Sequence, residues 1–382
     1  MNSAVQFEVL ACAGQRRIGV ATLNRPQTLN GLTLEMCELL QEQLTLWEND
    51  AAIAMVVLAG AGGKAFCAGG DLHGLYQAMQ ENTGGAWDNA YARRFFEVEY
   101  RLDYHIHTYS KPVLCWGSGI VMGGGVGLMM GASHRVVTET TRFAMPEITI
   151  GLFPDVGGTW MLSRLPRGIG NFLALSGAQL GAGDLRMLGL ADYVLPAASW
   201  PQVLEQLRAL DWPGERRAAD IQLGRVLREA GAGLAAQESG PLQRHYEAIN
   251  NACDGADLAA ISAYIADLQA SDDPWLQRAA ATHRAGSPGS ARLCFELLRR
   301  SQLLSLADAF RQEYIVSLHC GVEGDFREGI RALLIDKDKS PKWNPARLAD
   351  ATPAWVERFF KQPWPARQAH PLADLEARPQ TG

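Results

Sequence analysis

Hydrophobic and polar positions follow two different patterns along the first two hundred residues. Between Thr33 and Trp47, apolar residues recur every three or four positions, which predicts an amphipathic helix with Thr33 as its N-cap. Continuous apolar runs rich in β-branched residues, such as "IAMVVLAG", predict strands that are covered on both faces. The predicted strands occupy residues 5–10, 17–23, 53–60, 111–119 and 134–138. Strands that alternate with helices in this way predict an α/β fold.

After about residue 211 the strand patterns end and only helical patterns continue. Across the whole chain, further helices are expected at residues 89–107, 168–176, 202–210, 256–270, 291–303, 304–318 and 324–334. We therefore predict an α/β domain over residues 1–210 and a helical domain over residues 211–362. Four prolines in residues 363–382 predict a flexible tail.

Composition limits the classes of partner. The net charge of −6 and the absence of a basic run argue against nucleic acid as the main partner. Seven scattered cysteines without a C-x-x-C pair give no signal for zinc or for a redox motif. Because the N-terminus lacks a signal-peptide pattern, we expect reduced thiols and a cytoplasmic location. No window of about 18 apolar residues predicts a membrane span.

Two glycine-rich clusters each follow a predicted strand. In residues 59–72, "AGAGGKAFCAGGDL", Ala65 follows Lys64 where a P-loop needs Ser or Thr, whereas Gly60 and Gly62 satisfy a relaxed dinucleotide fingerprint. A nicotinamide-dependent oxidoreductase is therefore one alternative. The second cluster, residues 117–131, begins a buried helix, where glycine serves either close packing or a row of amides aimed at an anion. Two such amides that converge on one oxygen form an oxyanion hole.

Two carboxylates lie in the largely apolar stretch "MPEITIGLFPDVGG", at Glu147 and Asp155. Burial of an acid without a partner is costly, so their presence calls for a reason. Acids beside proline and glycine often only cap or turn the chain. Beside a polarised carbonyl group, the same acids would act as a base or as a nucleophile.

Two ordered motifs resemble the crotonase (enoyl-CoA hydratase/isomerase) superfamily: "KAFCAGGDL" and "GGGVGLMMGASHRVVTETTRFAMPEITIGLFPDVGG". The resemblance implies a spiral of ββα turns, here with an extended α-helical C-terminal portion, that binds acyl-CoA thioesters. It also implies that the amides of Gly70 and Gly124 hold the thioester oxygen. A hydratase of this superfamily uses two glutamates. One matches Glu147, but Gly127 stands at the position of the other.

The stretch around Glu147 and Asp155, together with "DFREGIRALLIDKDKSPKWNP", is similar to the 3-hydroxyisobutyryl-CoA hydrolases. This resemblance implies that Glu147 and Asp155 are catalytic and that Glu99 contacts the substrate, with a second acid nearby at Glu97. The implied reaction is hydrolysis of a short branched 3-hydroxyacyl-CoA thioester in valine breakdown. It needs no metal and no separate cofactor, because coenzyme A arrives as part of the substrate.

Two other functions stay open at this point. One is an enoyl-CoA hydratase or isomerase of the same fold, and the other is a non-catalytic acyl-CoA-binding protein. The sequence leaves open the exact acyl group, the residues that bind the CoA nucleotide and whether the chain forms a homo-oligomer. It also does not decide whether Glu147 is a nucleophile or a general base.

Overall fold

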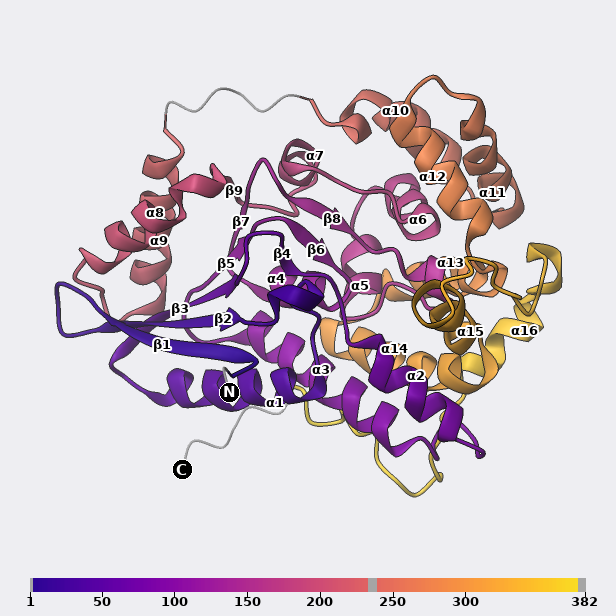
Figure 1. Cartoon of the computed structure of the whole chain (residues 1–382), viewed down its shortest axis with the longest axis horizontal. Coiled ribbons are helices and arrows are strands. Elements are labelled where there is room, and N and C mark those ends of the chain that lie inside the picture. Colours follow the sequence, from indigo (N-terminus) through magenta and orange to yellow (C-terminus); the bar gives the residue numbers. More distant parts are fainter. Residues whose placement is uncertain (1–2, 233–238, 377–382) are drawn as a thin grey trace. The chain divides into compact units, whose positions relative to one another are not determined.

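The computed structural model describes residues 3–232 and 239–376, which divide into two compact units (Figure 1). Unit 1 comprises the described residues of Met1–Gly70, His105–Phe143 and Gln179–Arg244, and unit 2 those of Asp71–Tyr104, Ala144–Ala178 and His245–Gly382. Each unit thus combines three stretches of the chain. The domain boundaries predicted at residues 210 and 362 stay a prediction.

A six-stranded sheet forms the centre of unit 1, with the strand order β1-β2-β3-β5-β7-β9. β1 pairs antiparallel with β2, and each later neighbouring pair is parallel. The bounds are Val5–Ala11 (β1), Arg17–Leu23 (β2), Ile53–Gly60 (β3), Val113–Gly117 (β5), His134–Val137 (β7) and Tyr193–Val194 (β9). The five predicted strands are therefore confirmed. The continuous apolar runs of β3 and β5 belong to parallel strands that are buried on both faces, whereas β1 is an antiparallel edge strand with exposed positions.

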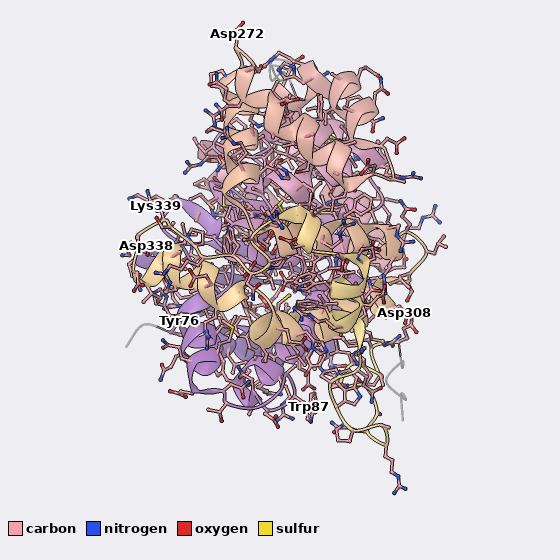
Figure 2. The ribbon with its side chains drawn as sticks, turned by 90° about the vertical axis from the view of Figure 1, so that its right-hand side faces the viewer. Tyr76, Trp87, Asp272, Asp308, Asp338 and Lys339 are labelled. Carbon is pink, nitrogen blue, oxygen red and sulfur yellow. The ribbon has the colours of Figure 1, made fainter. Side chains whose placement is uncertain are left out.

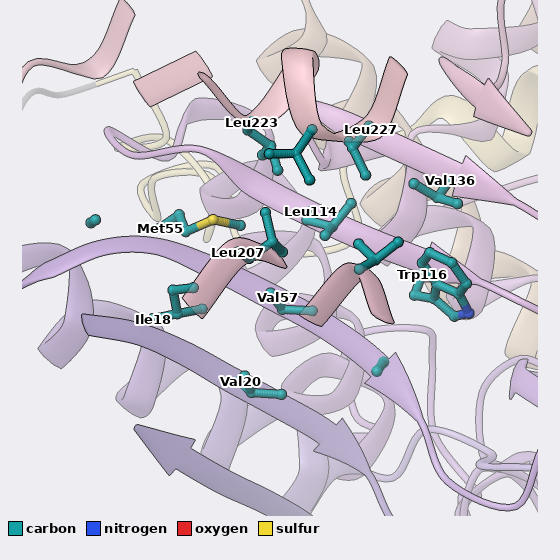
Figure 3. Packing of buried hydrophobic residues seen from close by; sticks show 14 of the residues in the cluster. Ile18, Val20, Met55, Val57, Leu114, Trp116, Val136, Leu207, Leu223 and Leu227 are labelled. Carbon is teal, nitrogen blue, oxygen red and sulfur yellow. The ribbon is translucent and has the colours of Figure 1, made fainter. Parts of the chain in front are cut away.

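Helices cover both faces of this sheet. In β2, Ile18 and Val20 point into a core with Leu207 of α8 (Trp200–Arg208) and with Leu223 and Leu227 of α9 (Arg216–Ala230) (Figure 3). Gly19 points to the opposite face, where an added Cβ atom would lie 2.7 Å from the ring of Trp47 on α1 (Leu34–Asn49). Residues 216–230, which the sequence analysis assigned to the C-terminal helical domain, thus pack on the sheet of unit 1.

A second sheet contains three short strands in the order β4-β6-β8, with bounds Ala65–Cys67, Ile120–Met122 and Arg142–Ala144. The sequence analysis missed these strands because three residues are too few to display a period. β4 and β6 run parallel, with Cys67 opposite Val121. Consequently, the turns that follow these two strands lie side by side.

The helix predicted from Thr33 onward is confirmed, because the Thr33 hydroxyl accepts a hydrogen bond of 3.2 Å from the Met36 amide. The other helices of unit 1 are α4 (Gly124–Gly131) and α7 (Ala182–Met187). Two helices belong to both units: α3 (Ala90–Thr108) lies in unit 2 up to Tyr104, and α10 (Pro241–Cys253) lies in unit 1 up to Arg244.

Unit 2 is otherwise helical in its described residues. Its α-helices are α2 (Leu72–Glu81), α5 (Gly158–Leu162), α6 (Arg167–Ser176), α11 (Leu258–Asp267), α12 (Pro274–Ala285), α13 (Pro288–Ser301), α14 (Leu306–Glu323), α15 (Phe326–Ile330) and α16 (Pro353–Glu357). A 3-10 turn, η2, spans Glu147–Ile150, and a π-helical turn spans Arg331–Ile335. Figure 2 shows Asp338 and Lys339 on the exposed loop that follows this π-helical turn. All seven predicted helices correspond to observed ones within a few residues. Seven other helices of the described residues had not been predicted individually: α2, α5, α7, α9, α10, α12 and α16.

Residues 363–376 pack against unit 2, although the prolines of this segment had predicted a flexible tail. Trp364 and Leu372 are buried, and Arg101 forms hydrogen bonds to both carboxylate oxygens of Asp374. Buried aromatic and aliphatic side chains thus anchor a segment without regular secondary structure. Residues 377–382 lie outside the described part of the chain. Among the helices that the structure describes, none is long and apolar enough to cross a bilayer.

Candidate active site

The two glycine turns of unit 1 carry the predicted oxyanion-hole residues, Gly70 and Gly124. Gly70 follows β4, and Gly124 is the first residue of α4, directly after β6. Because the first amides of a helix have no intrahelical acceptor, the Gly124 N–H is available to an external oxygen. The residues directly before them, Gly69 and Gly123, have φ angles of +113° and +49°. Glycine adopts such positive φ angles more readily than other residues do. The structure thus brings the two turns together, as the oxyanion-hole interpretation requires.

Close packing explains another glycine of the second cluster. A Cβ atom on Gly125 would lie 2.3 Å from the carbonyl oxygen of Cys67, so only glycine fits where α4 crosses the end of β4. The dinucleotide interpretation of Gly60 and Gly62 is wrong. The glycines after β3 lead into strand β4, whereas the fingerprint requires a helix at that point. The oxidoreductase alternative therefore loses its basis.

In unit 2, Glu147 is the first residue of the 3-10 turn η2. The Glu147 carbonyl accepts from the amide of Gly151, whose φ is +75°, and from that of Leu152 at 3.1 Å. A Cβ atom on Gly151 would lie 2.3 Å from the backbone of Asp325, so the turn rests directly on the start of α15. The Glu147 side chain is 5% exposed, and its Oε2 atom is buried without a hydrogen-bond partner. A buried carboxyl oxygen that the protein leaves unpaired is available to a substrate or a water molecule.

Asp155 lies eight residues further on, in the turn that leads into α5. It is 6% exposed, and its Oδ2 atom accepts a hydrogen bond of 2.7 Å from the hydroxyl of Tyr100 on α3. The next residue, Val156, has a φ of +52°. Positive φ is unusual for a β-branched residue, so the conformation of this turn is held by its surroundings.

Two more carboxyl groups come from α3, at Glu99 and Asp103, one helical turn apart. Both are buried, with exposures of 2% and 0%, and both oxygens of Asp103 lack a hydrogen-bond partner. Glu97, the competing acid of the sequence analysis, forms a partly exposed ion pair with Arg101. Glu99 is therefore the acid of this pair that belongs to the buried group, whereas Asp103 was missed.

Burial dominates the electrostatics of these acids. It raises the pKa of Glu147 well above the usual glutamate value, and the negative charge of Asp155 raises it further. Burial raises the pKa of Asp155 to about 6, although the hydrogen bond from Tyr100 opposes this shift. Burial and neighbouring carboxylates also raise the pKa values of Glu99 and Asp103. An ionised Asp155 therefore disfavours the ionisation of Glu147, so the two acids titrate as a coupled pair.

Two thiols near the acids are not nucleophiles. Cys294 and Cys320 are fully buried, and burial raises both thiol pKa values far above neutrality, so they stay protonated. Cys67 is likewise buried, in β4. Within the described ranges, no three His, Cys, Asp or Glu side chains are grouped as metal ligands.

The structure thus gathers Glu99, Glu147 and Asp155 in unit 2, and it brings the turns of Gly70 and Gly124 together in unit 1. The assignment of these five residues to one catalytic site stays a prediction. Besides Asp103, the sequence analysis missed Tyr100, whose role depends on its contact with Asp155. The Glu99–Asp103 spacing of four on a predicted helix was the one available signal for Asp103.

Comparison with known proteins decides the family. The family model described as "Enoyl-CoA hydratase/isomerase" matches residues 18–360 of this chain. The chain belongs to the enoyl-CoA hydratase/isomerase family. Among family relatives, "3-hydroxyisobutyryl-CoA hydrolase, mitochondrial" of Danio rerio is 39% identical over 94% of this chain and 90% of its own length. The protein of the same name from Xenopus tropicalis is 38% identical over 90% of this chain and 86% of its own length. The predicted resemblance is therefore confirmed.

Solved structures of the family confirm the crotonase-like α/β fold with a helical C-terminal portion. A protein described as an enoyl-CoA hydratase from Rhodobacter sphaeroides 2.4.1 matches with a TM-score of 0.79 and 35% identity, over 94% of this chain and 97% of that one. A protein described as a carnitinyl-CoA dehydratase from Mycobacterium thermoresistibile matches with a TM-score of 0.80 and 38% identity, over the same shares. Both matches extend over the helical C-terminal portion.

Proposed function

We propose that this protein hydrolyses a short branched 3-hydroxyacyl-CoA thioester, with 3-hydroxyisobutyryl-CoA as the preferred substrate. The products are the 3-hydroxy acid and free coenzyme A, and the reaction belongs to valine breakdown. The observation that carries the proposal is the burial of Glu147 and Asp155 in one electrostatically coupled group. Relatives that are 38–39% identical over most of their length and carry the hydrolase name support the choice of substrate.

In the proposed reaction, the amides of Gly70 and Gly124 bind the thioester oxygen and stabilise the negative charge that develops on it. One such donor is worth about 3–4 kcal/mol in the barrier. In one route, ionised Glu147 attacks the acyl carbon, the C–S bond breaks, and the thiolate leaves and takes a proton. Water then hydrolyses the mixed anhydride. In the other route, Glu147 takes a proton from a water molecule, which attacks directly. Both routes consume one water for each thiol released.

Asp155 and Glu99 have supporting roles in this proposal. Because the charge of Asp155 raises the pKa of Glu147, the two acids titrate as one coupled system. The hydroxyl group of the substrate is a natural partner for Asp155 or Glu99, since each buried carboxyl lacks full hydration. The requirement for this hydroxyl explains the preference for a 3-hydroxyacyl group.

Hydration of an enoyl-CoA is the second candidate, and the name of the Rhodobacter relative favours it. The position that carries the second glutamate in hydratases is Gly127 here, within buried α4. A glycine has no side chain to take or give a proton. This difference supports hydrolysis over hydration.

A panel of acyl-CoA thioesters, scored for the release of free thiol, tests the proposal. We expect the branched 3-hydroxyacyl thioester to be cleaved fastest, with crotonyl-CoA neither hydrated nor cleaved at a comparable rate. Hydration of crotonyl-CoA without thiol release would favour the second candidate. Tight binding of every thioester without turnover would favour a non-catalytic acyl-CoA-binding protein.

Location and cofactors stay predictions. A cytoplasmic location is expected from the sequence, whereas the hydrolase relatives are named as mitochondrial. We propose that the reaction uses no cofactor other than the coenzyme A of its substrate.

A further inference from the structure

Helix α14 carries two buried polar side chains on one face. It begins near Asp308, which lies exposed at its first turn (Figure 2), and passes inward to Glu313 and Ser317, which both have 0% exposure. Residues four apart on a helix lie above one another, so these two side chains face the same neighbours. Buried polar groups nearly always form hydrogen bonds. The hydrogen-bond partners of Glu313 and Ser317 therefore indicate what this face of the helix does.

Glu313 holds the turn that follows Asp155. Its Oε2 atom accepts a hydrogen bond of 2.8 Å from the amide of Gly157, and its Oε1 atom accepts one of 3.1 Å from the amide of Thr159. The hydroxyl of Thr159 also donates to Oε1. One carboxyl group thus accepts hydrogen bonds from three donors on either side of the junction between this turn and α5, directly after Val156 with its unusual positive φ. Glu313 therefore supplies the external support that this conformation requires.

Ser317 holds the other side of Asp155 through Tyr100. The Tyr100 hydroxyl donates to Oδ2 of Asp155 over 2.7 Å and lies 2.8 Å from the hydroxyl of Ser317. A phenol has one proton, so when it donates to Asp155, Ser317 must donate to the phenol oxygen. The ring of Tyr100 packs against Phe310 of the same helix, with 5.6 Å between ring centroids. The hydrogen bonds therefore run in one direction, from Ser317 through Tyr100 to Asp155.

We propose that α14 is the positioning element of the reaction, with Glu313, Ser317 and Tyr100 as positioning residues for Asp155. Glu313 fixes the backbone beside Asp155, while Ser317 and Tyr100 fix its Oδ2 atom. This leaves Oδ1 as the oxygen that meets the substrate hydroxyl or a transferred proton. The role of Oδ1 toward the substrate rests on the proposed function. The positioning of Asp155 is a property of the protein without substrate.

Titration of Asp155 in the substrate-free protein tests the positioning. Protein labelled with carboxyl-13C aspartate is followed by NMR from pH 4 to pH 9, and an Asp155→Asn variant identifies the signal. In Tyr100→Phe, we expect the midpoint of Asp155 to rise by about one to two pH units, because the donor that stabilises the carboxylate is lost. Ser317→Ala shifts the midpoint in the same direction by a smaller amount.

Tyr314→Phe is the matched control for this titration. Tyr314 is also fully buried, but its hydroxyl donates to the carbonyl of Arg93. The control removes one tyrosine hydroxyl, as Tyr100→Phe does, and leaves the Asp155 midpoint unchanged. The proposal is overturned if Tyr100→Phe leaves the midpoint in place, or if Tyr314→Phe moves it equally far.

A pair of substitutions at Thr159 tests the Glu313 side. Thr159→Ser keeps the hydroxyl that donates to Glu313, whereas Thr159→Val removes it with little change in shape. This test requires a wild-type enzyme that hydrolyses the thioester. In Thr159→Val, we expect kcat to fall about tenfold or more relative to wild type, while KM stays within about threefold of the wild-type value. In Thr159→Ser, we expect kcat to recover. Equal kcat values in the two variants would overturn this part. A wild type without hydrolytic activity would refute the proposed function, while the NMR titration would still decide the positioning.

Discussion

The negative charge of Asp155 raises the pKa of the buried carboxyl group of Glu147. The two acids are eight residues apart, and the rest of a 3-10 turn, Gly151 and Pro154 lie between them in the chain. This coupling means that one acid ionises before the other, so they are suited to different tasks. It also makes the pH dependence of the reaction a direct test of the site.

The first prediction concerns Glu147 itself. Glu147→Gln removes the group that attacks or activates water, so we expect kcat for thiol release to fall by about 10³-fold or more. The fold should persist, because the amide has nearly the shape of the acid that it replaces. Kinetics and circular dichroism check both statements. Glu205→Gln, at an exposed position of α8, is the control and should keep wild-type activity. An active Glu147→Gln enzyme would exclude Glu147 from the mechanism.

The second prediction concerns the pH profile. Since Glu147 must lose its proton to act and its pKa is raised, kcat/KM should increase with pH through the neutral and alkaline range. Asp155→Asn removes the charge that raises this pKa, so the rising limb should move to lower pH while turnover falls strongly. Profiles from pH 5 to pH 10 measure both effects. A limb that stays in place or moves to higher pH would contradict the assigned coupling.

The third prediction uses the buried carboxyl of Asp103. Its pKa is higher in the folded than in the unfolded chain. The contribution of the protonated Asp103 carboxyl to the free energy of unfolding is therefore fully present below the pKa of the unfolded chain. This contribution is lost as the pH rises through the pKa of the folded chain. Compared with wild type, Asp103→Asn should become more stable as the pH rises from 5 to 9, because the variant has no carboxyl group to ionise in the buried site. Urea unfolding at both pH values measures the gain. Asp272→Asn, at an exposed site (Figure 2), should show none, and an equal gain in both variants would refute the argument.

The fourth prediction concerns packing behind the proposed oxyanion hole. Gly125→Ala places a methyl group 2.3 Å from the Cys67 carbonyl oxygen, and backbone atoms cannot move aside cheaply. We expect a loss of about 3 kcal/mol or more in the free energy of unfolding, measured with urea. In Gly181→Ala, the added methyl group meets no atom within 4 Å, so this variant should lose far less. Equal stabilities would show that α4 can shift away from β4.

The sequence predicted those features that depend on local pattern. The apolar runs identified the main strands, and the spacing from Thr33 to Trp47 identified α1 with its cap. Glu147 and Asp155 stood out because acids are rare in an apolar stretch with glycine and proline. Glu99 was found by resemblance alone, since Glu97 occupies a similar setting in the sequence.

The missed features depend on contacts between distant segments. Glu313 and Ser317 lie on a predicted helix, but their partners Gly157 and Tyr100 are 156 and 217 residues away. No periodicity reveals which polar residues of a helix face inward when the bonds that satisfy them come from elsewhere in the chain. The packing of residues 363–376 was missed for the same reason, because prolines describe the local backbone and not the surface that covers it.

The contact between Gly151 and the backbone of Asp325 has a consequence for synthesis on the ribosome. The turn that carries Glu147 lacks its support until α15 has emerged, and the turn after Asp155 lacks its support until Glu313 has emerged. A nascent chain that already holds both acids therefore lacks both of these supports until about five-sixths of it has been made.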